Sequence, residues 1–208
     1  MLTGLLFAAC RKPQIAKTIM IGDPCPWVDS SNKHPKNAAL SALLEKYRKQ
    51  GLPGISMLIH DSNGTWTGAT GKADIENNID FVPGTISKVA SITKFFMSTL
   101  VFRLIEDSVH TGLGYQAINT KISNWLPAGV IRNLPNGRLV TLGQCMNHET
   151  GIPDVIEQNE FYLAVLNNPN KKWRPEELLE FIYNKTPLFA PSDTAVYSNT
   201  NTILIKMV

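Results

Sequence analysis

The sequence has 208 residues, enough for one domain or for one domain with an inserted lobe. Its hydrophobic fraction of 43% and charged fraction of 18% are typical of a globular protein with a hydrophobic core. The net charge of +3 is small and scattered, which argues against a nucleic-acid partner, and no apolar run approaches the roughly 18–20 residues of a membrane-spanning helix.

The N-terminal run of residues 5–10 resembles the cleavage box of a bacterial lipoprotein signal, in which the cysteine is lipidated. This resemblance predicts a signal at residues 1–10, lipidation of Cys10 and export to the periplasm or cell surface with membrane attachment. The run is short and no Lys or Arg precedes it, so the alternative is an apolar N-terminus without a signal function. Residues 11–37 are polar and interrupted by prolines, which is typical of a linker.

The cysteines are too far apart in sequence to indicate a disulfide framework or a metal site. They are Cys10, Cys25 and Cys145, with no Cys-x-x-Cys and no histidine at ligand spacing. Cys145 lies in an apolar helical pattern and is expected to be a small core residue.

An amphipathic helix and a hairpin are predicted in the first part of the chain. Residues 38–50 place apolar side chains on one face and charged side chains on the other. Residues 55–59 and 65–69 are strand-like, and the turn residues between them end in Gly64, which tolerates a positive φ. Residues 71–80 are predicted to form a polar loop.

A second helix is predicted to begin near Ser91. Apolar residues recur at positions 97, 100, 101, 104 and 105, which predicts that most of this helix is buried. Lys94 lies one helical turn after Ser91, so the two side chains share a face. A serine hydroxyl becomes a strong nucleophile when a nearby base takes its proton, and a lysine whose pKa is lowered towards neutrality can be that base.

The Ser-x-x-Lys pattern alone is weak support for this chemistry. It also occurs at Ser30 and Lys33, in a stretch rich in Pro, Asn and Ser. The alternative interpretation of Ser91 is an ordinary N-cap followed by an exposed lysine.

In residues 112–137, glycines and prolines divide the chain into short segments. Three further helices are predicted after this stretch. Residues 140–146 form the first, N-capped by Thr141. Residues 175–183 form the second, and residues 200–208 form the first turns of the third.

Four segments of the chain, in the same order, resemble those of a known family. They are residues 51–56; residues 83–85 with the Ser-x-x-Lys segment 89–94; residues 140–142 with the His-x-Thr-Gly segment 147–154; and the Tyr-x-Asn segment 197–201. The family is the serine β-lactamase-related hydrolases of the class C type, with penicillin-binding D-alanyl-D-alanine carboxypeptidases and related esterases. One departure is Ser192, where the family usually has a glycine.

The resemblance implies an α+β fold of the β-lactamase/transpeptidase type over residues 38–208. In this fold an antiparallel sheet is flanked by helices, beside a mostly helical lobe. The family's third motif, a Lys or His two residues before a glycine on a sheet-edge strand, would follow after Val208. We therefore expect residues 38–208 to be the incomplete N-terminal part of such a domain, with its C-terminal sheet strands missing.

The resemblance also implies a role for each motif residue. Ser91 would attack a carbonyl to form an acyl-enzyme, with Lys94 holding or taking its proton and the Ser91 N–H as one oxyanion donor. Tyr197 would be the second acid–base group, and Asn199 would hydrogen-bond Lys94 and the substrate amide. Without the resemblance, Tyr197 could be a buried aromatic bonded to a backbone carbonyl, and Asn199 a helix cap, alone or in addition.

His148 and Glu149 suggest a metal site, but no second histidine follows at helical spacing. We therefore predict a loop-stabilising hydrogen-bond pair and expect neither a metal nor a cofactor. His60 and His110 have no partner in the sequence and are predicted at the surface or at a strand end.

The sequence as a whole predicts a serine hydrolase that acts through a Ser91 acyl-enzyme on an ester, a β-lactam or a D-alanyl amide. The substrate would be a small molecule or a peptide. The alternative is a truncated, inactive remnant, or a non-enzymatic binding or sensor module of the same fold. The sequence leaves both open, together with the choice of substrate and the oligomeric state.

Overall fold

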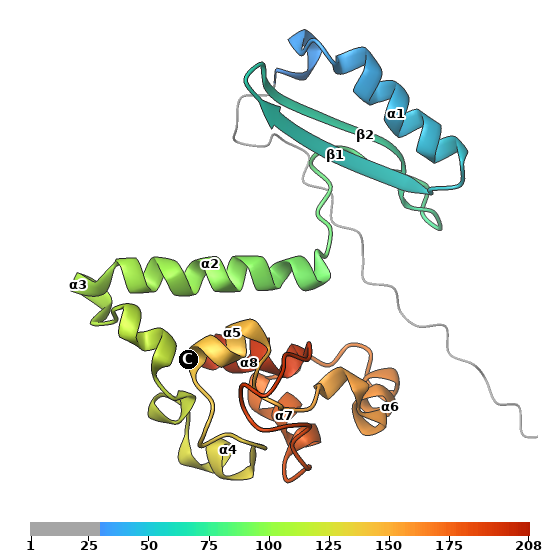
Figure 1. Ribbon diagram of the computed structural model, residues 1–208. Helices are drawn as coiled ribbons and strands as arrows, with labels where there is room; N and C mark the ends of the chain where they lie inside the picture. Colours follow the sequence, from blue (N-terminus) through green and yellow to red (C-terminus); the bar gives the residue numbers. More distant parts are fainter. Residues whose placement is uncertain (1–29) are drawn as a thin grey trace, which may run out of the picture. The chain divides into compact units, whose positions relative to one another are not determined.

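The computed structural model describes residues 30–208, which divide into two compact units at the Lys88–Val89 boundary (Figure 1). We call residues 30–88 the sheet unit and residues 89–208 the helical unit. The predictions for Cys10, for Cys25 and for the signal at residues 1–10 lie outside the described residues. None of the described helices is both long and apolar enough to span a membrane.

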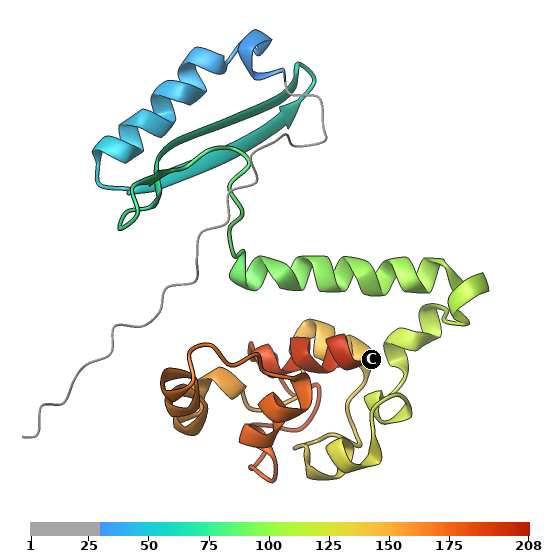
Figure 2. The same ribbon diagram turned by 180° about the vertical axis from the view of Figure 1, so that it is seen from behind.

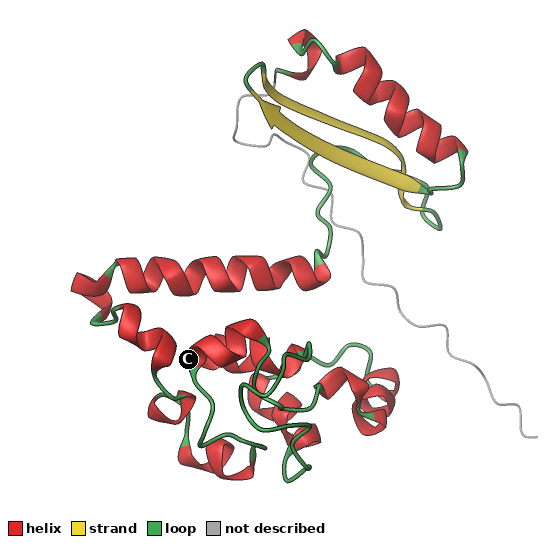
Figure 3. Cartoon of the chain, in the orientation of Figure 1, coloured by secondary structure: helices red, strands yellow, loops and turns green. Residues whose placement is uncertain are grey.

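The sheet unit consists of one α-helix, one short 3₁₀ helix and a three-stranded antiparallel sheet of order β1-β2-β3 (Figure 3). Its elements are the 3₁₀ helix η1 (Ser31–Lys33), α1 (Asn37–Lys49), β1 (Gly54–Asp61), β2 (Gly64–Asp74) and β3 (Ile79–Asp80). The predicted helix and hairpin are confirmed, and Gly64 has the positive φ of +113° that the turn requires. The loop predicted at 71–80 is wrong, because backbone pairing carries β2 on to Asp74 and returns the chain as β3.

One face of the sheet packs against α1. Trp66 and Leu44 are buried there, and the indole Nε1 of Trp66 donates a hydrogen bond to Asn37 Oδ1 at 2.8 Å. A Cβ at Gly68 would lie 2.3 Å from the Trp66 ring, so glycine is required for this close approach. The last residues of the predicted linker also pack on the hairpin, since the Ser30 N–H donates to the Thr65 carbonyl at 2.9 Å.

The helical unit contains no strands among the residues that the structure describes (Figure 3). Its helices are α2 (Thr93–Glu106), α3 (Ser108–Thr111), α4 (Ala128–Asn133), α5 (Leu142–Asn147), α6 (Asn159–Asn167), α7 (Pro175–Leu179) and α8 (Asn199–Met207). Short 3₁₀ helices connect them: η2 (Ala90–Ile92), η3 (Tyr115–Asn119), η4 (Ile122–Asn124), η5 (Val155–Glu157) and η6 (Glu180–Ile182). The helices predicted at 140–146, 175–183 and 200–208 are confirmed as α5, α7 with η6, and α8.

Helix α5 begins as the sequence predicts. Thr141 Oγ1 accepts the Gln144 N–H at 3.2 Å, and Gln144 Oε1 accepts the Thr141 N–H at 2.9 Å. This reciprocal pair is a capping box, which satisfies two backbone donors at once. Helix α8 lies beside α5 in both views of the chain (Figure 1 and Figure 2).

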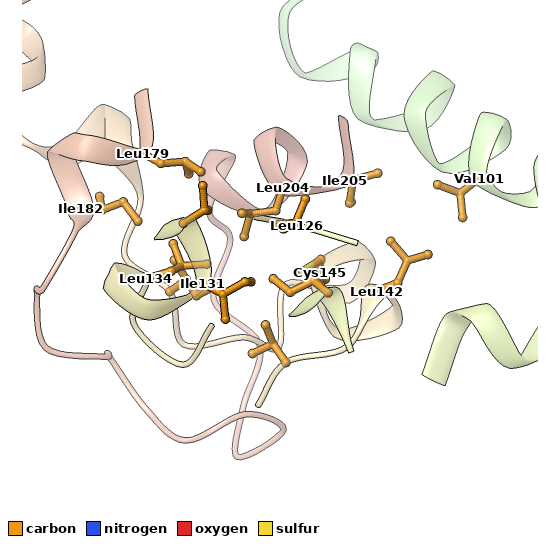
Figure 4. Close-up of a cluster of buried hydrophobic side chains, with 14 of the residues drawn as sticks. Val101, Leu126, Ile131, Leu134, Leu142, Cys145, Leu179, Ile182, Leu204 and Ile205 are labelled. Carbon is orange, nitrogen blue, oxygen red and sulfur yellow. The ribbon is translucent and has the colours of Figure 1, made fainter. Parts of the chain in front are cut away.

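A continuous apolar core fills the helical unit (Figure 4). Leu179, Ile182 and Leu204 in this core are completely buried. Cys145 is buried as well, and burial raises the pKa of its thiol to about 12. Its predicted place in the core is therefore confirmed, and a thiol held in its neutral form is chemically inert.

The prediction that α2 is mostly buried is wrong. Val101 and Ile105 are buried, but Leu100 is 51% exposed and the flanking Phe95 and Phe96 are 71% and 61% exposed. The apolar periodicity of α2 covers more than one face of the helix, and only the face carrying Val101 and Ile105 contacts the core of the helical unit.

We predict that Leu179→Ala costs about 2–5 kcal/mol of unfolding free energy, because it removes a fully buried side chain and leaves a cavity. The matched control is Leu163→Ala on α6, where the leucine is 60% exposed and the expected change is within about 0.5 kcal/mol. Urea denaturation of both variants checks the difference. Equal losses would contradict the described core.

Candidate active site

Ser91 is the middle residue of η2 and lies two residues before Thr93, where α2 begins. The preceding residue, Ala90, has a φ of +45°, a left-handed conformation that is uncommon for a residue with a Cβ. The Lys94 side chain, one turn further on, donates a long hydrogen bond of 3.5 Å from Nζ to Ser91 Oγ. Ile92 is the N-cap of α2 and no side chain caps this end, so the alternative interpretation of Ser91 as an N-cap is wrong.

Tyr197, in the segment that leads to α8, reaches the same hydroxyl. Its Oη lies 2.7 Å from Ser91 Oγ, and Lys94 Nζ lies 5.0 Å from the centre of its ring. The Tyr197 side chain is half exposed and its hydroxyl faces Ser91, so the alternative of a buried aromatic bonded to a backbone carbonyl is wrong.

The surroundings of Tyr197 make its phenol easier to ionise than that of an ordinary tyrosine. Desolvation opposes ionisation, but interactions with Lys94 and the hydrogen bond with Ser91 outweigh it and hold the pKa of the phenol below its ordinary value. A phenol with a lowered pKa is a better proton acceptor at neutral pH than an ordinary tyrosine, because a larger fraction of it is ionised.

Asn199 is the first residue of α8 and contacts Lys94. Its Oδ1 accepts a hydrogen bond from Lys94 Nζ at 2.7 Å, and its Nδ2 donates to Asp154 Oδ2 at 2.8 Å. The N-cap of α8 is Ser198, and no side chain caps this helix, so the alternative interpretation of Asn199 as a helix cap is wrong.

His148 holds the segment that carries Tyr197. It ends α5 in a left-handed conformation, with a φ of 60°. Its backbone carbonyl accepts the Val196 N–H at 3.0 Å, and its ring Nδ1 accepts the Ser198 N–H at 3.2 Å. The imidazole also packs on the Tyr197 ring, with the ring centres 4.6 Å apart and the ring planes tilted by 31°.

The hydrogen-bond partners of His148 are therefore Val196, Ser198 and, at 3.3 Å from its Nδ1, the Asn201 amide, so the predicted His148–Glu149 pair is wrong. A backbone N–H can only donate, so Nδ1 must carry a lone pair and the proton of the neutral ring is on Nε2. Burial and the nearby Lys94 charge lower the pKa of His148 and favour this neutral form.

The loop at residues 150–155 fixes the first turn of α8. Thr200 Oγ1 donates to the Pro153 carbonyl at 2.8 Å and accepts the Val155 N–H at 3.0 Å. Thr150 Oγ1 donates to Asn201 Oδ1 at 2.7 Å, and all three of these polar side chains are completely buried. Because each of these side chains has a hydrogen-bond partner, burial leaves none of the three unsatisfied.

Ser192 occupies a left-handed turn, with a φ of +71°, which accounts for the glycine usual in the family at this position. Here the turn is held by two hydrogen bonds. Gln144 Nε2 donates to Ser192 Oγ at 2.7 Å, and the Ser192 N–H donates to the Glu149 carbonyl at 2.9 Å.

The structure thus brings all four sequence-predicted residues of the helical unit together at one place: Ser91, Lys94, Tyr197 and Asn199. Sequence reasoning missed the contributions of Asp154 and of the His148 ring, although both belong to the segment 147–154 that carried the resemblance. Across residues 30–208, no three His, Cys, Asp or Glu side chains converge where they could hold a metal ion.

The family model called Beta-lactamase matches residues 40–208. This chain belongs to the beta-lactamase family. The predicted family and the α+β fold of the β-lactamase/transpeptidase type are therefore confirmed. A comparison with the curated proteins gave no match.

Solved structures agree with the beta-lactamase family assignment. A D-stereospecific amidohydrolase from Streptomyces sp. is 29% identical, with a TM-score of 0.65 over 83% of this chain and 48% of that chain. A D-amino acid amidase from Ochrobactrum anthropi SV3, complexed with L-phenylalanine amide, is 25% identical, with a TM-score of 0.65 over 82% of this chain and 44% of that chain. A penicillin-binding protein from Bacillus halodurans, at 18% identity, shares the fold, with a TM-score of 0.60 over 81% of this chain and 46% of that chain. This member of the family spans less than half the length of each of the three.

We predict that the helical unit loses stability as the pH falls from about 7 to 5. An unfolded histidine takes up a proton near pH 6.5, whereas the folded state holds the pKa of His148 lower, so protons favour the unfolded chain in this window. His148→Gln keeps an acceptor for the Ser198 N–H without titrating, and should flatten this pH dependence in urea denaturation.

The control for this measurement is His110→Gln, which removes a histidine that lies outside the site and forms an exposed ion pair with Asp107. Its effect on the slope of stability against pH should be smaller than that of His148→Gln, because exposed ion pairs contribute little to stability. A slope that is the same in wild type and His148→Gln would contradict the described environment of His148.

Proposed function

We propose that this chain acts as a serine hydrolase that forms an acyl-enzyme at Ser91 on an amide, a β-lactam or an ester. The observation that carries the proposal is the Ser91 hydroxyl, which lies at a helix start with a phenol 2.7 Å away and an ammonium 3.5 Å away. Membership of the beta-lactamase family supports it. So do the two amide-hydrolysing relatives, which by their names act on D-configured compounds.

Tyr197 would be the direct proton acceptor. As the phenolate it takes the proton of Ser91 Oγ while Oγ forms a bond to the substrate carbonyl carbon, and the carbonyl oxygen becomes an oxyanion. The distance of 2.7 Å is that of a direct O–H···O hydrogen bond, so no water need relay the proton.

Lys94 would act on both oxygens as a positive charge. Its Nζ contacts Ser91 Oγ and lies over the Tyr197 ring, and its ammonium therefore stabilises negative charge on either oxygen during the proton transfer. The backbone N–H of Ser91, at the start of α2, would donate to the oxyanion, aided by the positive end of the helix dipole.

The acyl-enzyme would form when the oxyanion collapses. The bond from the carbonyl carbon to the leaving nitrogen or oxygen breaks, and Tyr197 returns the proton it holds to that atom. A water molecule would then attack the Ser91 ester while Tyr197 accepts its proton. When the bond from the carbonyl carbon to Ser91 Oγ breaks, Tyr197 returns this proton to Oγ and the acid is released.

The test is covalent labelling of the folded chain with a fluorescent penicillin and with a fluorophosphonate. We expect one label per chain, on Ser91, abolished in Ser91→Ala and retained in Ser98→Ala, a serine further along α2. Tyr197→Phe should slow labelling by about 10²- to 10⁴-fold, the range typical for loss of a general acid–base group. Hydrolysis of D- and L-phenylalanine amide then tests the configuration of the substrate.

Absence of label from both reagents, in a sample that shows a cooperative unfolding transition, would contradict the proposal. A catalytically inactive remnant, or a non-enzymatic binding or sensor module, of the beta-lactamase fold would then be the remaining interpretation. Labelling that survives in Ser91→Ala would contradict it equally.

A further inference from the structure

A buried carboxylate lies behind the candidate site. The Asp154 side chain, 4% exposed, accepts the Asn199 amide on Oδ2 at 2.8 Å and the Ile156 N–H on Oδ1 at 3.2 Å. Asp154 forms no ion pair with any Lys, Arg or His of residues 30–208. An unpaired buried charge is costly, so its hydrogen bonds must satisfy it.

The Asn199 amide bridges this carboxylate and the Lys94 ammonium. An ammonium can only donate and an ionised carboxylate can only accept, whereas an amide has one end of each kind. Only one orientation therefore satisfies both neighbours, with Oδ1 towards Lys94 and Nδ2 towards Asp154. The flipped amide would place its NH₂ against the ammonium and its oxygen against the carboxylate, and would lose both hydrogen bonds.

We propose that Asp154 is a positioning residue of the candidate active site, which acts through the Asn199 amide to hold Lys94 against Ser91 and Tyr197. The inference deepens the proposed function and rests on it. Without the Asp154 charge the amide can turn, and Lys94 then loses its 2.7 Å acceptor and moves away from the serine hydroxyl. A lysine displaced by about 1 Å slows the chemical step by up to about 100-fold.

Asp154→Asn tests this role with little change of shape. The variant keeps an oxygen that can cap η5 through the Ile156 N–H, but its NH₂ then faces the NH₂ of Asn199. Asp154→Ser is the second variant, since serine also caps a helix and lacks the oxygen that faces Asn199. The matched control is Asp193→Asn, which removes the same charge from an exposed position.

The first measurement is a double-mutant cycle in the rate of Ser91 labelling, with wild type, Asp154→Asn, Asn199→Ala and the double variant. We expect Asp154→Asn to reduce the maximal acylation rate about 10- to 100-fold with little change in the half-saturating reagent concentration. The double variant should be no slower than Asn199→Ala, because Asp154 acts through that residue. The proposal would be overturned if the rate losses of Asp154→Asn and Asn199→Ala multiply in the double variant. It would also be overturned if Asp154→Asn and Asp154→Ser both label at the wild-type rate.

The second measurement does not depend on reactivity. In a ¹H–¹⁵N spectrum the side-chain NH₂ of Asn199, assigned by its loss in Asn199→Ala, should shift in both Asp154 variants and stay in place in Asp193→Asn. An unshifted Asn199 NH₂ in both Asp154 variants would overturn the proposal. Wild type that takes no label while this NH₂ shifts would instead reject the proposed function and leave the Asp154–Asn199 contact intact.

Discussion

The hydrogen bond between Ser91 Oγ and Tyr197 Oη joins residues 106 positions apart, and the candidate site depends on it. Because α2 begins two residues after Ser91 and α8 begins two residues after Tyr197, the bond forms only if the two helix starts are held together. The Lys94–Asn199 bond crosses between the same two helices and makes a second link. The site is therefore a property of the packing of α2 and α8, and not of either motif alone.

Polar groups hold these helix starts, in addition to the apolar core. His148 binds the backbone on both sides of Tyr197, and the 150–155 loop binds Thr200 and Asn201. Buried networks of this kind favour a single arrangement strongly, because any other arrangement leaves donors or acceptors unpaired. Apolar contacts are not directional and would allow α8 to slide, whereas these hydrogen bonds fix its position.

Hydrogen-bond acceptors and donors alternate through the site in a way that serves the proposed chemistry. The Asp154 carboxylate, the Asn199 amide and the Lys94 ammonium form a line of alternating acceptor and donor groups. At its end the ammonium faces the Ser91 hydroxyl and the Tyr197 ring. The His148 ring packs on Tyr197 in its neutral form and adds no positive charge there. The positive charge that lowers the pKa of Tyr197 is therefore that of Lys94.

Local features were the ones that the sequence predicted well. The Gly64 turn and the Thr141 cap depend on neighbouring residues, and helical spacing alone placed Lys94 beside Ser91. Tyr197 is too distant in sequence for such reasoning and came only from the family resemblance. The partners of His148 depend on how α5 meets the tyrosine segment, and the burial of α2 depends on what packs around it, so neither followed from periodicity.

The pKa of Tyr197 tests the account most directly, because it reports the geometry without requiring a substrate. Titration of the chain with ¹³Cζ-labelled tyrosine, assigned by Tyr197→Phe, gives this value in wild type and in Lys94→Met. The account predicts a wild-type pKa below the ordinary tyrosine value of about 10 and a rise when Lys94 is removed. A wild-type pKa at or above about 10 that does not respond to Lys94→Met would contradict it.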